Sequence, residues 1–386
     1  MSPRPLQAVV VMGTRPEAVK LAPVVLELRR APREFQVTLA STGQHRHLLP
    51  RHLRPFGLQP DLELDIMTPR QSLAQVTARS VSGLGAAFGR LRPEVVIVEG
   101  DTTAVFAGAL AAFYQKIPIA HVEAGLRTDD KFHPFPEEIN RRLTAVVTDI
   151  HLAPTRRAKE NLLREGIPAK AIYVTGNTAI DALLFAARQE ASPPKLPWGG
   201  EGRRRLLVVT AHRRESWGRP LEQIALALRY LARRFSEVQI VVAVHPNPTV
   251  RATFEKVLGK TGRVALIRPP DYLPFVQLLK RAYFIMTDSG GIQEEAPSLG
   301  VPVLVLRETT ERVEGIRAGN AELVGRSRSG IVAAARALLE DPAKREKMAK
   351  VSNPYGDGKA ASRIRRALLH YFGRAGRRPR DFGGDP

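Results

Sequence analysis

The chain has 386 residues, 44% of them hydrophobic and 25% charged, which is typical of a globular protein too long for one ordinary core. It contains no cysteine, which excludes disulfides, thiolate metal ligands and a cysteine nucleophile. The formal net charge is +21, but the basic residues are dispersed, with no zinc-finger spacing and no RNA-binding aromatic motif, so we expect no nucleic-acid partner. No apolar run approaches the roughly 20 residues of a membrane span, and the start has no signal-peptide pattern. We therefore expect a cytoplasmic protein without a membrane partner.

In the first half, short apolar runs alternate with segments of helical periodicity. Continuous apolar runs of this kind are typical of strands buried on both faces of a parallel sheet. The alternation predicts a doubly wound α/β domain. The predicted strands are 8–12, 36–40, 95–98, 117–122 and 149–152, and the clearest helices are 73–91, 103–114 and one that begins at Glu137.

The second half repeats this pattern after a segment rich in proline and glycine. We predict that residues 188–205 are a linker, because they lack periodicity. The expected domains are residues 1–187 and 206–359, both Rossmann-like, and we expect residues 376–386 to be a disordered tail. In the second domain the predicted strands are 206–210, 239–244 and 264–267, and the predicted helices are 221–235 and 275–282.

Residues 284–305 are the most informative stretch, because they predict a strand, a turn, a helix and a second strand. Ser289 stands at the predicted N-cap, and Gly290-Gly291 would let a ligand approach the backbone closely. Amides at a helix start, together with the helix dipole, suit a phosphate group. Glu295 lies far enough along this helix to accept hydrogen bonds from sugar hydroxyls.

Polar residues fall directly after nearly every predicted strand. In open parallel sheets ligands bind beyond the carboxyl ends of the strands, so these residues are expected to converge on one crevice, between two domains that face each other across a cleft. A diphosphate could be held there by Arg15, His212 or Arg312. The dinucleotide fingerprint and the Walker A motif are both missing, which disfavours NAD and ATP. The residues in question are Arg15, Lys20, Asp101, Glu123, Glu137, Arg141, His212, Ser289, Glu295 and Arg312.

Structural alternatives remain open for several of these residues. Asp101 could instead cap the helix that follows it. Glu137 and Arg141, like Glu138 and Arg142, are four apart, which is typical of surface salt bridges on a helix. Lys20 could be solvated, and His212 and His245 could be satisfied core imidazoles.

Eight segments together closely resemble the non-hydrolysing bacterial UDP-N-acetylglucosamine 2-epimerases, in the order found in that family. The resemblance spans about residues 8–325. It implies a fold similar to GT-B glycosyltransferases, with a C-terminal helix, 360–375, that joins the first domain. The segments are GTRPE (13–17), TGQHR (42–46), GDTT (100–103), HVEAGLR (121–127), PEEINR (136–141), HRRE (212–215), DSGGIQEEAPS (288–298) and TTER (309–312).

The resemblance implies reversible conversion of UDP-N-acetylglucosamine (UDP-GlcNAc) to UDP-N-acetylmannosamine (UDP-ManNAc), with no cofactor and no metal. The sugar C2 proton is not next to a carbonyl, so elimination of UDP to a 2-acetamidoglucal, followed by re-addition, is the expected route. Asp101, Glu123 and Glu137 would be the acid–base candidates, and His212 and Arg15 would stabilise the leaving diphosphate. Further substrate contacts are implied for Lys20, Arg141, Phe275 beside the uracil, Ser289, Gly290, Gly291, Glu295 at the ribose, and Arg312.

The family also implies a homodimer that supplies cell-surface polysaccharide synthesis. It implies a second, activating UDP-GlcNAc site, for which Gln44, Arg70, Gln71 and His245 match. This chain departs from the family pattern at His47, Trp217 and Val313. The rival functions are a glycosyltransferase of the same fold, a hydrolysing 2-epimerase and, outside the enzymes, a polyanion-binding protein.

Overall fold

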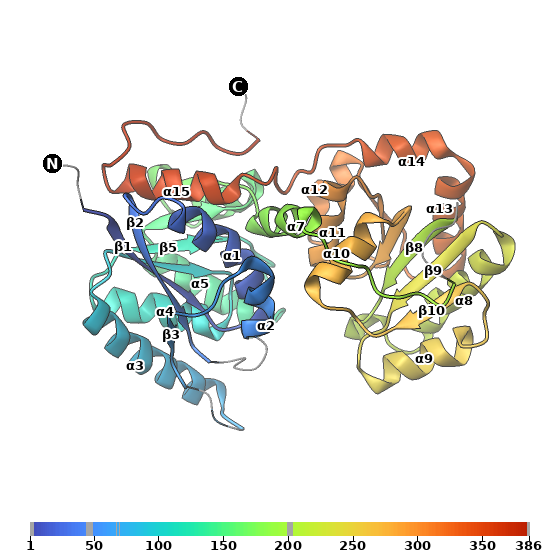
Figure 1. The fold of residues 1–386 in the computed structure, drawn as a ribbon, viewed down its shortest axis with the longest axis horizontal. Helices are drawn as coiled ribbons and strands as arrows, with labels where there is room; N and C mark the ends of the chain where they lie inside the picture. Colours follow the sequence, from blue (N-terminus) through green and yellow to red (C-terminus); the bar gives the residue numbers. More distant parts are fainter. Residues whose placement is uncertain (1–3, 44–48, 67, 69, 199–203, 384–386) are drawn as a thin grey trace. The chain divides into compact units, whose positions relative to one another are not determined.

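The computed structural model describes residues 4–43, 49–66, 68, 70–198 and 204–383. The chain forms two compact units: Met1–Ala182 with Gly356–Pro386, here called unit 1, and Leu183–Tyr355, here called unit 2. The boundary between them falls within one helix, α7 (Thr178–Arg188). Each unit is a parallel sheet with helices on both faces (Figure 1). In the described part of the chain, no helix combines the length and the apolar character needed to cross a membrane.

The sheet of unit 1 has seven parallel strands in the order β3-β2-β1-β4-β5-β6-β7. The chain moves outward from β1 to β3 and then returns to pair β4 on the other side of β1. The strand order therefore reverses between β1 and β4, where open α/β sheets bind ligands. The strands are β1 (Leu6–Met12), β2 (Phe35–Ser41), β3 (Leu62–Glu63), β4 (Val95–Glu99), β5 (Ile119–Val122), β6 (Ile150–Ala153) and β7 (Ile172–Val174).

Helices cover both faces of this sheet. α1 packs against α15 on one face, and α3, α4 and α5 lie side by side on the other (Figure 1). Arg365 of α15 makes a two-bond ion pair with Glu34, at 2.7 and 2.8 Å, which ties the C-terminal helix to the turn between α1 and β2. The helices of unit 1 are α1 (Arg15–Arg29), α2 (Leu49–Leu53), α3 (Leu73–Leu91), α4 (Thr103–Tyr114), α5 (Glu137–Val147), α6 (Arg156–Arg164) and α15 (Ala360–Tyr371), with 3-10 turns Arg54–Phe56 and Ala169–Ala171.

The sheet of unit 2 repeats this topology with six parallel strands in the order β10-β9-β8-β11-β12-β13, and its order reverses between β8 and β11. The strands are β8 (Arg205–Thr210), β9 (Val238–Ala243), β10 (Val264–Ile267), β11 (Phe284–Thr287), β12 (Val303–Val305) and β13 (Ala321–Leu323). The helices are α8 (Arg219–Arg234), α9 (Pro248–Leu258), α10 (Tyr272–Lys280), α11 (Gly290–Glu295), α12 (Val313–Ala318), α13 (Arg328–Glu340) and α14 (Pro342–Ala349), with 3-10 turns Arg214–Ser216 and Ala296–Leu299.

The predicted fold class, two Rossmann-like parallel sheets, is confirmed. Residues 376–383, which fall within the predicted tail, return to the edge strand β7. The Phe382 amide donates to the Val174 carbonyl at 2.7 Å, and Asp381 pairs with Lys159 at 2.8 Å. Arg378 lies 4.1 Å from the ring centre of Tyr173. β7 is the edge strand of the sheet, so its outer backbone groups are open to hydrogen bonds from the tail. The amino-acid composition of the tail gives no sign of these partners.

Candidate active site

The first turn after β1 in unit 1 is organised around the buried carboxylate of Glu17. Glu17 accepts hydrogen bonds from the Gly13 amide at 2.6 Å and from the hydroxyls of Thr14 and Thr102 at 2.8 and 2.7 Å. Burial raises the pKa of Glu17, and these hydrogen bonds oppose the shift. The carboxylate thereby fastens the β1–α1 turn to the loop that follows β4.

Lys20, on the second turn of α1, reaches two carboxylates at the ends of neighbouring strands. Its ammonium lies 2.5 Å from Glu123 Oε2 and 3.1 Å from Glu99 Oε1. Glu99 is the last residue of β4, and Glu123 directly follows β5. Glu123 has a φ of 64°, a left-handed conformation that is rare for a non-glycine residue and that accumulates at functional sites. The interpretation of Lys20 as merely solvated is wrong.

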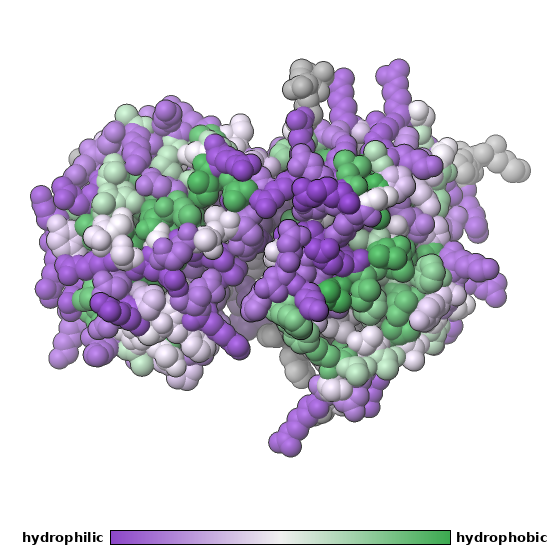
Figure 2. Space-filling model, turned by 180° about the vertical axis from the view of Figure 1, so that it is seen from behind, coloured by the Kyte–Doolittle hydropathy of each residue, from purple (hydrophilic) through white to green (hydrophobic). Residues whose placement is uncertain are grey.

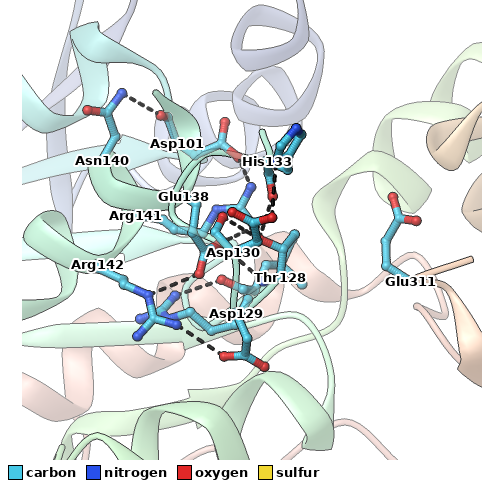
Figure 3. Close-up of polar contacts among 12 residues, drawn as sticks. Asp101, Thr128, Asp129, Asp130, His133, Glu138, Asn140, Arg141, Arg142 and Glu311 are labelled. Atoms are coloured by element: carbon cyan, nitrogen blue, oxygen red, sulfur yellow. Dashed lines mark hydrogen bonds and ion pairs between the residues drawn. The ribbon is translucent and has the colours of Figure 1, made fainter. Parts of the chain in front are cut away.

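Asp101 faces α5 across the same strand ends (Figure 3). Its carboxylate accepts from Arg141 Nη2 at 2.7 Å, and its carbonyl accepts from Asn140 Nδ2 at 3.0 Å. Burial raises the pKa of Asp101, although the charge of Arg141 opposes the shift. The alternative role of Asp101 as a helix cap is wrong, because Thr102 is the N-cap of α4 and accepts from the Val105 amide.

The two carboxylates at the start of α5 differ in their partners. Glu138 is fully buried and binds Arg142 at 3.0 Å, Arg141 at 3.4 Å and the Thr128 amide at 3.1 Å, which holds the loop before α5 (Figure 3). Glu137 is half-buried, and among the described residues its Oε2 has no hydrogen-bond partner. The predicted surface pair Glu137–Arg141 does not form, since Arg141 turns to Asp101 instead.

A buried histidine fixes the loop that carries Asp101. His121, in the middle of the sheet on β5, donates from Nε2 to the Gly100 carbonyl at 2.7 Å. Burial lowers the pKa of His121 to about 4, so the ring is neutral at physiological pH. Gly100 directly precedes Asp101, so this hydrogen bond helps to position Asp101 without placing a further charge beside it.

In unit 2 the corresponding strand ends meet at the buried carboxylate of Asp288. Asp288 directly follows β11, and its Oδ2 accepts from the backbone amides of His212 and Arg213 at 2.8 and 2.9 Å. The Ser216 hydroxyl is 3.3 Å from the same oxygen. Asp288 therefore shapes the loop after β8, which presents His212 and Arg213.

The His212 ring is half-buried and is not a core imidazole. Its Nδ1 lies 3.3 Å from Asp288 Oδ1, and it stacks on the ring of the exposed His245, with centres 5.4 Å apart. Burial lowers the pKa of His212, Asp288 opposes this, and His245 and Arg213 lower it further. The Trp217 indole donates to the His212 carbonyl at 3.1 Å, so the tryptophan by which this chain departs from its family pattern supports this loop.

The predicted N-cap position of Ser289 is confirmed, but the Ser289 amide is already bonded to the Thr287 hydroxyl at 3.0 Å. The next residue is Gly290, on which a Cβ would lie 2.9 Å from Cζ of Arg312, so a larger residue there would push the guanidinium aside. Arg312 is held there by Glu294, at 2.8 Å from its Nε, and by Glu311. A guanidinium therefore lies directly over the start of α11.

The remaining predicted residues are only partly tied into these clusters. Arg15 is exposed and forms no ion pair within the described part of the chain. Phe275 packs partly against the core of unit 2, and Glu295 lies half-buried beside Gly291. Arg70 is exposed, and the Gln71 side chain accepts from the Thr68 amide and donates to the Ile66 carbonyl. Gln44 lies outside the described residues.

Comparison with known proteins identifies the family. A family model described as UDP-N-acetylglucosamine 2-epimerase matches residues 26–369. The UDP-N-acetylglucosamine 2-epimerase of Bacillus subtilis (strain 168) is 48% identical over 379 residues, 98% of this chain and 99% of the relative. The enzyme of the same name from Escherichia coli (strain K12) is 47% identical over 371 residues, 94% and 98% of the two chains. The chain belongs to the UDP-N-acetylglucosamine 2-epimerase family.

The resemblance to the non-hydrolysing bacterial members of this family is thereby confirmed, and the chain is an isomerase of that family. The fold agrees as well. The crystal structure of UDP-GlcNAc 2-epimerase from Neisseria meningitidis bound to UDP-GlcNAc superposes with a TM-score of 0.84 at 44% identity, covering 95% of this chain and 100% of the other.

Sequence reasoning missed four polar residues that the structure brings to these strand ends. Glu99, which directly follows the predicted strand 95–98, was given no role, and Glu17 was noted only as part of the GTRPE segment. A charged residue that terminates an apolar strand at the ligand-binding edge is the signal that could have found Glu99. The other two, His121 and Asp288, are buried polar residues that lie within or directly after strands.

Proposed function

We propose that this epimerase interconverts UDP-GlcNAc and UDP-ManNAc by eliminating and re-adding UDP. The observation that carries the proposal is the set of carboxyl groups at the adjacent ends of β4 and β5 and at the start of α5. Three of them, Asp101, Glu123 and Glu137, supply what a proton transfer at C2 needs: acid–base groups held close together in partly dehydrated surroundings.

In the proposed reaction a carboxylate takes the C2 proton while the C1–O bond breaks and its electron pair leaves with UDP. The product of this step is a 2-acetamidoglucal. UDP then adds back to C1, and a carboxylic acid returns a proton to C2 on the opposite face. Two faces require two groups in different protonation states. Asp101, whose pKa burial raises, suits the acid, and Glu123, which contacts the Lys20 ammonium, suits the base.

Unit 2 supplies groups suited to the leaving diphosphate. Arg312 lies over Gly290, where the helix dipole of α11 also favours an anion, and the His212 ring is half-exposed. In unit 1, exposed Arg15 stands at the first position of α1 and is a further cation for the same purpose. Glu295 and Phe275 are our candidates for the ribose and the uracil.

The test is incubation with UDP-GlcNAc in deuterated water, without NAD or added metal. We expect UDP-ManNAc as the product and deuterium at C2 of both epimers, because the removed proton exchanges with solvent. Free N-acetylmannosamine with no UDP-ManNAc would instead favour the hydrolysing class. Transfer of the sugar to an added acceptor would indicate a glycosyltransferase, and salt-sensitive polyanion binding without turnover would indicate a binding protein.

We further propose that unit 1 forms a homodimer through the outer face of α5. Ile139, Leu143 and Val146 are exposed at helical spacing on this face, and Phe113 and Tyr114 are exposed at the end of neighbouring α4. Figure 2 shows hydrophobic residues gathered on the rear face of this unit. Exposed apolar patches of this kind mark interaction surfaces. Val146→Glu should produce a monomer in light-scattering chromatography, whereas Leu163→Glu on α6 should leave the dimer intact.

The activating site also remains a proposal. Arg70 and Gln71 of unit 1 and His245 of unit 2 are its described candidates, with Gln44 as the fourth. Initial rates should then rise more steeply than hyperbolically with UDP-GlcNAc, and Arg70→Ala should make the curve hyperbolic without abolishing turnover.

A further inference from the structure

The ammonium group of Lys20 is shared by two buried carboxyl groups. It lies 2.5 Å from Glu123 and 3.1 Å from Glu99, whose side chains are 10% and 1% exposed. The parallel register pairs Glu99 with Val122, the residue before Glu123, so the two carboxyl groups project from neighbouring strand ends toward one cation. Ionising both would leave a net negative charge in a site with little water, which is costly.

The neighbouring groups do not relieve this imbalance. Asp101 already uses Arg141, and Glu17 is satisfied by amide and hydroxyl donors. His121 is neutral, and half-buried Glu137 on α5 adds a further carboxyl group. Of the groups in the described part of the chain that face this site, Glu99 therefore has Lys20 as its one cationic partner.

We propose that Glu99 is a positioning residue that shares a single negative charge with Glu123, with Lys20 as their common counter-ion. When Glu123 is ionised, Glu99 keeps its proton and holds Lys20 in place. When Glu123 takes up a proton, Glu99 releases its own to solvent water, so the lysine always faces one carboxylate. The catalytic value of this arrangement rests on the proposed function, but the shared charge itself does not.

The electrostatics of the site agree with this geometry. Burial raises the pKa of Glu99 well above its usual value; Lys20 opposes the shift, and the charges of Glu123 and Glu17 add to it. A negative charge on Glu123 therefore disfavours a second negative charge on Glu99. Removing the charge of one should therefore ionise the other.

Infrared difference spectroscopy on the substrate-free protein at pH 7.5 tests the shared charge, because a protonated carboxyl group has its own C=O stretching band. The wild-type protein should show absorption in this band, and Glu99→Gln should lose the component that belongs to Glu99, leaving that of any other protonated carboxyl group such as Asp101. Glu123→Gln should lose the Glu99 component too, because Glu99 then has Lys20 to itself and ionises. The matched control is Asp181→Asn, since Asp181 is a buried carboxyl of unit 1 with a pKa raised to about 6 that accepts instead from the amides of α15. This control should keep the Glu99 component.

The reciprocal loss is the decisive result. A Glu99 component that persists in Glu123→Gln would overturn the proposal, because the proton of Glu99 would then be independent of Glu123. A wild-type protein without a Glu99-dependent band would overturn it as well, since both groups would be ionised. If Asp181→Asn also lost this component, the loss would reflect a general change in the protein rather than the charge shared by Glu99 and Glu123. That result would count equally against the proposal.

Deuterium exchange at C2 tests the positioning role. Glu99→Leu should lower kcat at least tenfold with little change in UDP affinity, and Glu99→Gln should recover most of the loss, because its amide keeps a polar oxygen at the position that lies 3.1 Å from the Lys20 ammonium. Equal losses in the two variants, or none in either, would remove the positioning role. A protein that passes the infrared test but forms no UDP-ManNAc would refute the proposed function and leave the shared charge in place.

Discussion

The two units have the same topology but opposite chemistry at their strand ends. In unit 1, the residues that follow β1, β4 and β5 bring together several carboxyl groups, and Lys20 and Arg141 are the cations that pair with them among the residues the structure describes. In unit 2, the residues that follow β8 and β11 use one buried carboxylate, Asp288, to present a histidine and an arginine. The fold therefore fixes where chemistry occurs, and the first few residues after each strand decide which chemistry it is.

The difference in burial is as informative as the difference in charge. In unit 1 the side chains of Glu99 and Glu123 are 1% and 10% exposed, and carboxyl groups removed from water in this way suit proton transfer. In unit 2, Arg312 and His212 have side chains that are 23% and 39% exposed, and they can meet a soluble anion. We therefore assign proton transfer to unit 1 and diphosphate binding to unit 2, and four predictions test that division.

The largest effect is expected for Glu123→Gln. Loss of an acid–base group typically costs 10²- to 10⁴-fold, so deuterium exchange at C2 should fall by about 10³-fold. UDP affinity, which we assign to unit 2, should change by less than about twofold. Glu160→Gln replaces an exposed glutamate of the same unit and is the control. A matching loss of UDP affinity in Glu123→Gln would erase the division between the units.

Sequence reasoning located the strand ends but not the pairing within them. Asp101, Glu123 and His212 were singled out because they lie within a few residues of the ends of apolar strands, a position that the parallel topology favours for ligand binding. The alternative of a surface pair between Glu137 and Arg141 was wrong, because helical spacing considers one helix at a time, whereas Asp101 approaches Arg141 from another element. The shared position of Lys20 depends on the register between β4 and β5, which no local pattern contains.

The next largest effect is expected at the start of α11. Gly290→Ala should weaken UDP binding by about tenfold. The added methyl group would lie 2.9 Å from Cζ of Arg312, which is too close, so the guanidinium would have to move away. When Arg312 is also replaced by alanine, the methyl group added by Gly290→Ala meets no guanidinium. The double variant should therefore bind UDP no more weakly than Arg312→Ala alone. Calorimetry on the four proteins measures the coupling. Additive losses would show that Gly290 acts without Arg312. The rate of C2 exchange in saturated enzyme should change much less than the affinity.

A smaller effect concerns pH. His212 has a pKa below its usual value, mainly through burial, so its ring is neutral in the free protein at pH 7.5. A bound diphosphate favours the charged ring and raises the pKa of His212. At a pH between the pKa of the free protein and that of the UDP-bound protein, UDP binding is therefore accompanied by proton uptake at His212. UDP affinity should therefore rise as pH falls toward the free pKa and level off below it. Calorimetry in buffers of different ionisation enthalpy measures the uptake. His212→Asn should abolish it, and uptake that persists there but disappears in His245→Asn would assign it to the stacked partner instead.

The smallest effect is expected for Trp217→Phe, which removes one hydrogen bond from the loop that presents His212. The indole donates to the His212 carbonyl at 3.1 Å, and a bond of this kind contributes about 1 kcal/mol, so UDP affinity should fall by about fivefold. Trp198→Phe is a matched control: Trp198 packs partly buried in the same unit, and no hydrogen bond from its indole is found among the described residues. Exchange at C2 in saturated enzyme should be nearly the same in both variants, because the carboxyl groups lie in unit 1. A selective loss of exchange rate in Trp217→Phe, with affinity preserved, would mean that the His212 loop acts in proton transfer after all.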